Sequence, residues 1–361
     1  MSRLGSLPRL FVLIGLILGG AASPVAIRAQ DATPGATPTV VNPVEKVALV
    51  TPESRTNQGW DQQAADGIEA VAKRRGIEAI VEENAGYEIE PLLADLADQD
   101  VQLVICHASG YQTVCPEFAA EEGIPVAVVE NPNAVAEDLV SDIETEAQEI
   151  AYLAGVLAGR LTRSGTVGVV VSDEPPTWNY MTVGFAEGLK ATKPDAQLVY
   201  SVIGVAAYGD AAGGKRVTDQ VLAAGADVVF GMGDGSTFGM IEAIRAHNAE
   251  NPDDKALFID VIGDKSQTVE DDLLLTSVLF DFTVIYEEMI RDLETDEFGK
   301  VYTLSVENKG VRLLDLPQSV PAEVVEAVAR AEAGILDGSI AVSAVPDADG
   351  VRATLDELFP G

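Results

Sequence analysis

Residues 166–171 have the sequence TVGVVV, an uninterrupted run of small and β-branched residues. Seven further stretches have the same character: 46–50 (KVALV), 77–82 (IEAIVE), 101–106 (VQLVIC), 125–130 (PVAVVE), 197–203 (QLVYSVI), 226–232 (ADVVFGM) and 256–262 (ALFIDVI). Continuous runs of this kind are typical of parallel β-strands that are covered on both faces. The stretches between them have helical patterns; residues 61–75, for example, place Ala65, Ile68 and Ala72 on one face and stop before Gly76. This alternation predicts an α/β protein built from βαβ units.

The two halves of this pattern resemble each other. With one gap, LADQDVQLVICHASG at 96–110 aligns with LAAGADVVFGMGDG at 222–235, and KVALVTPES at 46–54 aligns with TVGVVVSDE at 166–174. Each of the latter stretches precedes a loop with one of the two tryptophans of the chain. We therefore expect two similar lobes. Ligands of doubly wound sheets bind beyond the carboxyl ends of the strands, so we expect a cleft lined by the residues that follow the strands.

The amino-terminal residues have the pattern of a secretory signal peptide. Two arginines precede or border residues 10–22 (LFVLIGLILGGAA), an uncharged run that is short for a membrane span of about 20 residues. We expect a signal peptide over residues 1–29, with an uncleaved anchor as the alternative, and an extended Pro/Thr-rich linker over residues 30–43. No cysteine follows the apolar run, so lipid attachment is not expected, and we expect an exported protein in the periplasm or outside the cell.

The charge of the chain argues against one class of partner. The sequence has 58 acidic and 23 basic residues and a net charge of −35. A surface of this charge repels the phosphates of nucleic acids and of anionic lipids, so we expect no nucleic-acid partner.

The chain has two cysteines, Cys106 and Cys115. In an exported protein an even number of cysteines suggests a disulfide. Because sequence spacing alone does not establish the Cα separation that a disulfide requires, a disulfide and two buried thiols both remain open.

Motifs for catalysis are weak in this sequence. It has no G-x-S-x-G elbow, and its two histidines are too far apart for an H-E-x-x-H zinc site. Cys106 and His107 are neighbours, so on a strand they would point to opposite faces. The loop GMGDGSTFG at 231–239 has the spacing G-x-G-x-G, which is not the dinucleotide fingerprint. We expect no enzyme, cofactor or metal, although a carboxylate pair for glycoside hydrolysis stays open.

Several longer stretches resemble one protein family in their order and spacing. They are TNQGWDQQAADGIEA (56–70), EAQEIAYLAGVLAGRLTRSGTVGVV (146–170), WNYMTVGFAEGLKATKP (178–194), GADVVFGMGDGSTFGMIEA (225–243), LLTSVLFDF (274–282) and ILDGSIAV (335–342). Together they are similar to the basic membrane protein (BMP) family of ABC-transporter substrate-binding proteins, whose best-known members bind purine nucleosides. The resemblance covers residues 45–342, and the Tyr152-Leu-Ala-Gly155 helix followed by residues 166–171 is its most specific part.

The resemblance implies a type I periplasmic-binding-protein fold: two doubly wound parallel-sheet lobes joined by a hinge that the chain crosses three times. We expect residues 44–141 and 268–299 in lobe 1 and residues 142–267 and 300–318 in lobe 2, with residues 319–361 unassigned. The resemblance also implies a monomer that closes on a small polar aromatic ligand, with a nucleoside or nucleobase favoured, and delivers it to an ABC permease in the membrane. A sensor that signals to a membrane partner and, less favoured, a secreted hydrolase are the alternatives.

Strand ends and resemblance together predict the ligand-binding residues. The stacking aromatic of the family falls on Trp60, and a flat purine with polar edges needs such a face beside hydrogen-bonding neighbours. The full expected set is Asn57, Trp60, Asp61, Gln62, His107, Tyr111, Glu130, Trp178, Asn179, Met181, Asp234, Gly235 and Asp264.

Each of these residues also has a structural alternative. Trp60 could instead pack in the core of its lobe, and Trp178 is either the opposing wall or an exposed rim aromatic. Asn179 and Asp234 are ligand contacts or helix N-caps. His107 contacts the ligand or only packs in its loop.

Three positions depart from the nucleoside-binding pattern that the resemblance implies. Asn57 stands where nucleoside binders often carry aspartate, Met181 stands where many carry phenylalanine, and no lysine lies near Phe280–Asp281. Asp264 and Lys265 are expected either as a charged pair at the mouth of the cleft or as a solvated turn.

Overall fold

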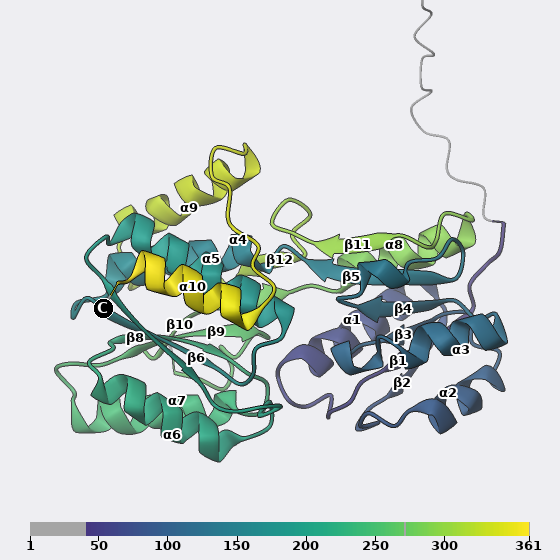
Figure 1. Ribbon diagram of the computed structural model, residues 1–361, viewed down its shortest axis with the longest axis horizontal. Helices are drawn as coiled ribbons and strands as arrows, with labels where there is room; N and C mark the ends of the chain where they lie inside the picture. Colours follow the sequence, from purple (N-terminus) through teal and green to yellow (C-terminus); the bar gives the residue numbers. More distant parts are fainter. Residues whose placement is uncertain (1–40, 271, 361) are drawn as a thin grey trace, which may run out of the picture. The chain divides into compact units, whose positions relative to one another are not determined.

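The computed structural model describes residues 41–270 and 272–360 (Figure 1). The expected signal peptide, and the expected linker up to residue 40, lie outside the described residues. The described chain forms two six-stranded sheets, each with helices on both faces. None of its helices combines the length and the apolar character that a membrane crossing requires.

Lobe 1 contains a fully parallel sheet with the strand order β11-β5-β4-β3-β1-β2. Its strands are β1 (Lys46–Val50), β2 (Glu78–Glu82), β3 (Val104–Cys106), β4 (Val126–Val129), β5 (Val140–Thr145) and β11 (Val301–Leu304). Val47 and Leu49 pack with α1 (Trp60–Arg75) and α8 (Thr283–Glu294). Ala48 and Val50 pack on the opposite face with α2 (Glu90–Ala97) and α3 (Val114–Glu122). Alternate residues of one strand thus cover both faces, as the continuous apolar runs predict.

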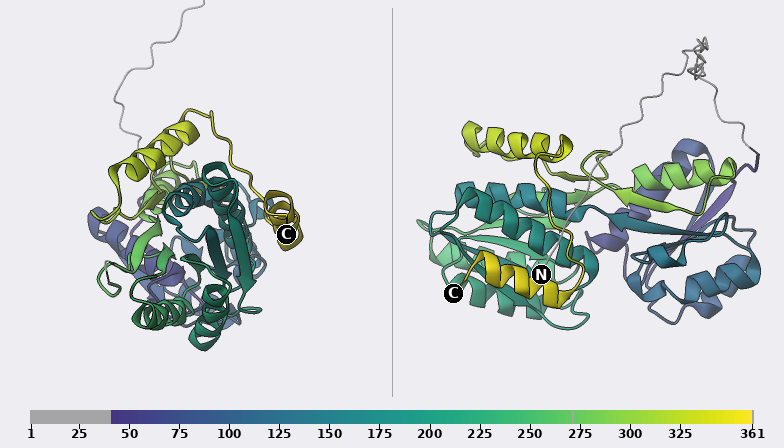
Figure 2. Two further views of the ribbon diagram at one scale, coloured as in Figure 1. Left: turned by 90° about the vertical axis from the view of Figure 1, so that its left-hand side faces the viewer. Right: turned by 45° about the horizontal axis from the view of Figure 1, so that its top comes forward.

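Lobe 2 repeats this arrangement with the strand order β12-β10-β9-β8-β6-β7. Its strands are β6 (Thr166–Val171), β7 (Gln197–Val202), β8 (Val228–Met232), β9 (Leu257–Ile262), β10 (Leu274–Phe280) and β12 (Val311–Leu313). Helices α4 (Ala147–Leu161) and α5 (Pro176–Thr192) cover one face, and α6 (Ala211–Ala223) and α7 (Thr237–Glu250) cover the other. Helices α9 (Ala322–Leu336) and α10 (Ala348–Leu358) lie outside α4 and α5 (Figure 2).

The two sheets confirm that the sequence halves are structural counterparts. Reading the strand orders side by side pairs β1 with β6, β2 with β7, β3 with β8 and β4 with β9. The sequence pattern predicts these eight strands and misses β5, β10, β11 and β12. In β5 the sequence VSDIET breaks its apolar run with buried Asp142, and β11 and β12 are only four and three residues long. One difference between the lobes is that β12 is antiparallel to its neighbour β10, whereas β11 is parallel to β5.

The strands at the hinge correct the expected lobe boundaries. β5 pairs with β4 in lobe 1, so the expected boundary after residue 141 falls inside a strand. β10 belongs to the sheet of lobe 2 and β11 to that of lobe 1, the reverse of the expectation for both. The chain crosses between the lobes after β5, after β10 and between β11 and β12. The carboxy-terminal helices pack on lobe 2.

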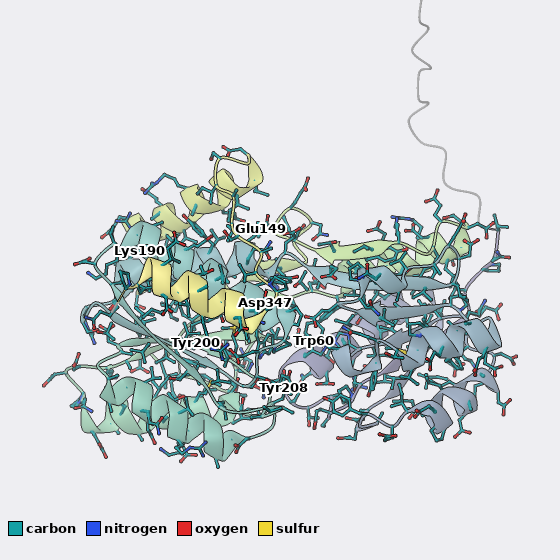
Figure 3. All side chains as sticks on the ribbon, viewed as in Figure 1. Trp60, Glu149, Lys190, Tyr200, Tyr208 and Asp347 are labelled. Atoms are coloured by element: carbon teal, nitrogen blue, oxygen red, sulfur yellow. A yellow bond between two sulfur atoms is a disulfide. The ribbon has the colours of Figure 1, made fainter. Side chains whose placement is uncertain are left out.

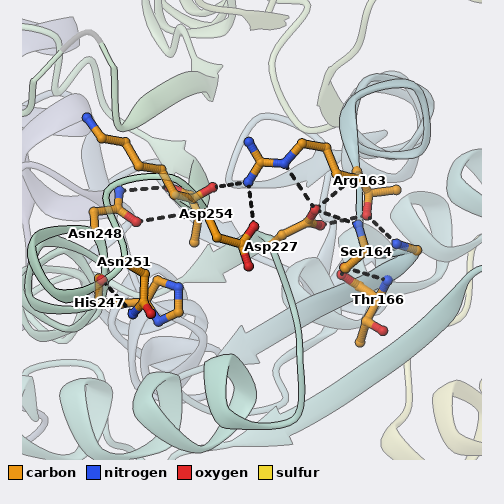
Figure 4. A network of polar contacts seen from close by, with 12 residues as sticks. Arg163, Ser164, Thr166, Asp227, His247, Asn248, Asn251 and Asp254 are labelled. Atoms are coloured by element: carbon orange, nitrogen blue, oxygen red, sulfur yellow. Dashed lines mark hydrogen bonds and ion pairs between the residues drawn. The ribbon is translucent and has the colours of Figure 1, made fainter.

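A polar network holds the turn between α4 and β6 (Figure 4). Asp227 Oδ1 accepts a hydrogen bond of 2.6 Å from Thr162 Oγ1, and its Oδ2 accepts from the backbone N–H groups of Arg163 and Ser164 at 2.6 and 2.8 Å. Asp227 directly precedes β8, so this carboxylate ties the entry of β6 to the neighbouring strand. The Thr-Arg-Ser-Gly stretch at residues 162–165 therefore stabilises the connection between α4 and β6.

Candidate functional site

A cavity of about 150 Å³ lies between the two lobes, at the carboxyl ends of both sheets. Lobe 1 contributes the loops after β1, β2, β3 and β4, and lobe 2 contributes those after β6, β7 and β8. The lining residues are Pro52, Glu53, Trp60, Asp61, Tyr87, His107, Ala108, Ser109, Gly110 and Glu130 from lobe 1 and Pro175, Thr177, Trp178, Tyr208 and Asp234 from lobe 2. The cavity thus occupies the place that doubly wound sheets reserve for ligands.

Trp60 is the first residue of α1 and forms one wall of the cavity. One face of its indole stacks on His107, with ring centroids 4.5 Å apart and planes 18° from parallel. Phe282 meets the pair edge-on at 5.1 Å, and the indole Nε1–H donates to the His107 carbonyl at 3.2 Å. The ring is packed on one side, as the core-packing interpretation expects, and it also lines the cavity; its role as a ligand wall stays a prediction.

His107 supports this wall as a neutral side chain. It is fully buried, and desolvation lowers its pKa to about 3. Its Nε2 lies 3.2 Å from the Trp60 carbonyl oxygen, and its Nδ1 lies 3.4 Å from the Tyr286 hydroxyl. Because both ring nitrogens have partners in the protein, His107 positions Trp60 and carries no charge to the cavity.

Aromatic residues also line the cavity on the side of lobe 2. Trp178 is 4 % exposed, and its Nε1–H donates to Ser172 Oγ at 2.9 Å. It lies within α5 and not in the expected loop before a helix, and its burial shows that the rim interpretation is wrong. Tyr208, in the loop between β7 and α6, lines the cavity together with Trp60 (Figure 3).

The sequence reasoning missed Tyr208 and Tyr87. Tyr87 follows β2 and is half exposed, and its ring lies over Gly110, where an added Cβ would come within 2.5 Å of the ring. Both tyrosines follow strands at the ligand-binding edge, and that placement is the signal that could have identified them. Glu53, Pro175 and Thr177 were missed in the same way.

Two buried carboxylates face the cavity from opposite lobes. Asp61 is 2 % exposed and accepts from Asn57 Nδ2 at 2.7 Å, and its pKa rises to about 7 because it is buried and lies near the charge of Asp234. Asp234 is 7 % exposed and accepts from the Trp60 N–H at 2.8 Å, and burial raises its pKa to about 6 despite this bond and the charge of Lys265. The cost of burying each charge is therefore only partly offset by the protein.

Direct hydrogen bonds join the lobes around the cavity. The Trp60 N–H donates to Asp234, and Lys265 Nζ donates to the Gln58 carbonyl at 2.8 Å. Glu130 Oε1 accepts from both the N–H and the Oγ1–H of Thr177, at 2.9 and 2.6 Å.

The backbone is in the left-handed region at Gln58, Glu130 and Ile262, with φ of 54°, 58° and 69°. Such conformations are costly, above all for a β-branched residue, and tend to cluster at functional sites.

Asn57 and Gln62 lie next to the cavity without lining it. Asn57 Nδ2 donates to Asp61, and its Oδ1 accepts from the N–H groups of Gly59 and Gln62 at the start of α1. Gln62 Oε1 accepts from the Gln58 N–H at 3.0 Å. Both residues therefore shape the loop that presents Trp60 and Asp61.

Three further expected residues lie in the protein interior. Tyr111 is fully buried and donates its hydroxyl to the Gly86 carbonyl. Met181 is fully buried in the core. Asn179 is 1 % exposed in the first turn of α5 and donates to the carbonyls of Glu174 and Pro346, so it is neither the N-cap nor a lining residue.

Gly235 and Asp264 also lie outside the cavity lining. Gly235 packs closely against the backbone of Gly209. Asp264 is exposed and accepts from the Ser266 N–H at 2.8 Å, which is the solvated-turn interpretation. Lys265 is fully buried and forms its ion pair with buried Asp260, so the expected pairing with Asp264 is wrong.

Cys106 and Cys115 form a disulfide with a Cα separation of 6.6 Å. It joins the end of β3 to α3 and encloses the segment 107–111, which contains four lining residues. The disulfide therefore restrains the loop that supports Trp60.

Comparisons with known proteins agree with this architecture. The family model described as ABC transporter substrate-binding protein PnrA-like matches residues 44–345. A Lactococcus lactis protein, the ABC transporter nucleoside-binding protein BmpA, is 24 % identical over 320 residues, which cover 82 % of this chain and 88 % of that protein. A CD4+ T-cell-stimulating antigen of Listeria monocytogenes is 22 % identical over 321 residues, with 83 % and 88 % covered.

Solved structures show the same fold. An ABC transporter solute-binding protein of Aeropyrum pernix superposes with a TM-score of 0.73 at 19 % identity, covering 88 % of this chain and 97 % of the other. Its counterpart from Conexibacter woesei superposes with a TM-score of 0.68 at 20 % identity, covering 83 % and 99 %.

Proposed function

Because this chain belongs to the Bmp family of PnrA-like ABC transporter substrate-binding proteins, we propose that it captures a nucleobase or nucleoside between its lobes and delivers it to an ABC permease. The observation that carries this proposal is the wall formed by Trp60, which His107 holds beside two buried carboxylates. The name of the Lactococcus lactis relative supports a nucleoside as the ligand.

The chemistry of the cavity suits a flat ring with polar edges. An aromatic wall offers a base its stacking surface and about 0.5–1.5 kcal/mol beyond simple burial. The carboxylates of Asp61 and Asp234 accept hydrogen bonds from ring or ribose donors, which are costly to bury without partners. A cavity of about 150 Å³ is smaller than the roughly 300–1,000 Å³ of sites for drug-sized ligands, so a base fits this closed arrangement more readily than a nucleoside does.

Closure of the lobes provides the mechanism of capture. Trp60 and Asp61 belong to lobe 1, and Trp178 and Asp234 belong to lobe 2, so a ligand touches all four only when the lobes are closed. A ligand that contacts both lobes favours the closed state by its affinity difference between the two states. The permease can then distinguish loaded from empty protein by the distance between the lobes.

A thermal-shift panel of nucleobases, nucleosides and sugars tests this function. A ligand at 100 times its Kd stabilises the protein by about 2.7 kcal/mol, and we expect this shift from bases or nucleosides. Recovery of the ligand intact separates capture from hydrolysis. A shift with sugars alone contradicts the proposal.

Substitution of the wall gives the matched test. Trp60→Ala should abolish most of the shift, whereas Trp60→Phe should keep part of it because a stacking face remains. Phe238→Ala, at an exposed aromatic of α7 outside the cavity lining, is the control. Unchanged affinity in a folded Trp60→Ala variant removes Trp60 from the binding site.

A further inference from the structure

Hydrogen-bond acceptors dominate the polar lining of the cavity. Four carboxylates line it, Glu53, Asp61, Glu130 and Asp234, and among residues 41–270 and 272–360 no lysine or arginine belongs to its lining. His107 is neutral because its pKa is about 3. A ligand therefore meets negative charge from both lobes and no compensating positive side chain in the wall.

The serine, threonine and tryptophan side-chain donors of the lining are already engaged within the protein. Thr177 gives both its N–H and its Oγ1–H to Glu130, and Ser109 Oγ gives its hydrogen to the other oxygen of Glu130 at 2.6 Å. The two indole N–H groups, of Trp60 and Trp178, donate to His107 and Ser172. What these residues offer a ligand is thus surface and not hydrogen-bond donors.

Tyrosine hydroxyls are the exception. Between residues 41 and 360, without residue 271, no hydrogen bond links the hydroxyl of Tyr87 or Tyr208 to the protein. Each hydroxyl can donate one bond to a ligand and accept others. Their two donors stand against eight carboxylate oxygens of the lining, of which three, both of Glu53 and Oδ2 of Asp234, accept no hydrogen bond in the described chain.

The excess of acceptors over donors is most marked at Asp61 and Asp234. Both are more than nine-tenths buried, and neither forms an ion pair with any residue that the structure describes. Lys265 is the nearby cation, but its partner is Asp260. The protein gives Asp234 a single hydrogen bond, from the Trp60 N–H to Oδ1, and in the described chain no bond reaches Oδ2. Two buried carboxylates of like charge are stabilised by any donor or cation that enters between them.

We infer that this site, within the binding function proposed above, selects ligands that present N–H donors or positive charge over ligands that present only carbonyl or carboxylate oxygens. The favoured class comprises amino-substituted heterocycles and flat amidinium or ammonium compounds. The aromatic residues Trp60, Tyr87 and Tyr208 add cation–π attraction for the charged members of this class. At pH 8, above the pKa values of both Asp61 and Asp234, an oxo group in the same place meets a carboxylate oxygen, acceptor against acceptor, and neither finds a partner.

Calorimetric titration with matched pairs tests the inference. Adenine against hypoxanthine, cytosine against uracil, and adenosine against inosine exchange an amino for an oxo group, and with it a ring nitrogen that accepts for a ring N–H that donates; the comparison therefore tests the position of the exocyclic donor. We expect the amino member of at least one binding pair to bind tenfold or more tightly, which corresponds to about 1.4 kcal/mol. Among benzamidine, benzamide and benzoate, which share one shape, affinity should fall in that order.

Substitutions of the lining carboxylates test which residues cause the preference for amino over oxo ligands. Asp234→Asn and Asp61→Asn each replace an acceptor by a group that also donates, so the amino-over-oxo ratio should fall to less than threefold. Glu53→Gln, at an exposed carboxylate, tests the same charge where folding is not at risk. Asp264→Asn, outside the cavity lining, should leave the ratio unchanged.

The outcomes separate this inference from the proposed function. Equal binding of amino and oxo partners overturns the donor preference and leaves nucleobase capture standing. Binding of benzamidine without any base or nucleoside supports the preference and contradicts the proposed ligand. Tighter binding of hypoxanthine, uracil or benzoate than of their partners, or binding of no probe at all, contradicts the inference.

Discussion

Asp61 and Asp234 make the stability of the free protein depend on pH. Their pKa values, about 7 and about 6, lie above the ordinary value of 3.8. The folded state therefore holds these protons more tightly than the unfolded chain. Their contribution to the free energy of unfolding is complete below about pH 4 and is lost as the pH rises through 6 and 7.

We expect this loss to be visible in urea unfolding at pH 5 and pH 8. Each carboxyl contributes a slope of up to about 1.4 kcal/mol per pH unit in its titration range. Asp61→Asn and Asp234→Asn cannot ionise, so each variant should lose less stability than the parent between these pH values. Because the net charge of −35 adds its own pH dependence, Asp264→Asn is the reference. Equal slopes in parent and variants would falsify the assignment.

Removal of the Lys265 charge should lower the free energy of unfolding by a large amount, because a buried carboxylate then loses its partner. It is fully buried, pairs with fully buried Asp260 and also donates to the Gln58 carbonyl of the other lobe. Lys265→Met should lower the free energy of unfolding by about 3–5 kcal/mol, because Asp260 is left charged and unpaired. The double variant Lys265→Met/Asp260→Leu should recover most of this loss in a denaturant titration. A double variant as unstable as the single one contradicts this account.

Helices α4 and α5 owe their close contact to glycines. A Cβ added at Gly155 would lie 2.1 Å from the Phe185 carbonyl oxygen, and one added at Gly188 would lie 2.1 Å from that of Tyr152. Real Cβ atoms do not approach backbone so closely, so alanine at either position must push the helices apart. This contact gives Gly155 of the Tyr-Leu-Ala-Gly stretch a physical role in the packing of α4 against α5.

We therefore expect Gly155→Ala and Gly188→Ala each to lower the melting temperature. Overpacking costs about 1–3 kcal/mol, which exceeds the gain of about 1 kcal/mol in helix propensity. Gly209→Ala is the control, because no atom of the part of the chain that the structure describes lies within 4 Å of the Cβ it would add. A rise in the melting temperature of either helix variant means that the helices adapt and that the contact does not require glycine.

A small number of polar contacts join the two lobes, and Glu130–Thr177, like Trp60–Asp234, links two residues that line the cavity. Thr177→Val removes the Oγ1 bond and keeps the N–H bond. Since one hydrogen bond contributes about 0.5–1.5 kcal/mol, ligand affinity should fall about twofold to twelvefold. Small-angle scattering should also show a larger radius of gyration for the unliganded variant.

Thr354→Val provides the control for closure. Its Oγ1 donates to the Gly350 carbonyl within α10, outside the cavity lining, so affinity and radius should not change. If Thr177→Val binds as tightly as the parent and scatters identically, Glu130–Thr177 does not contribute to closure.

Much of the fold could be read from the sequence because its signals are local. Runs such as TVGVVV are apolar at every position because both faces of the strand are covered, and the helical periodicity between them comes from residues three and four apart. The repeat of these signals predicted two similar lobes. The strand-end rule then placed Trp60, Asp61, Glu130, Trp178 and Asp234 at the edge where the cavity lies.

Tertiary structure alone decided the rest, because it depends on partners that are distant in sequence. β5, β10 and β11 join the lobe of their pairing strand, and no local pattern records that choice. His107 is neutral because surrounding elements bury it, and Lys265 pairs with Asp260 and not with the adjacent Asp264. Asp234 contacts Trp60 across 174 residues of chain. Local sequence determines which elements form, whereas burial and charge pairing arise only when those elements pack together.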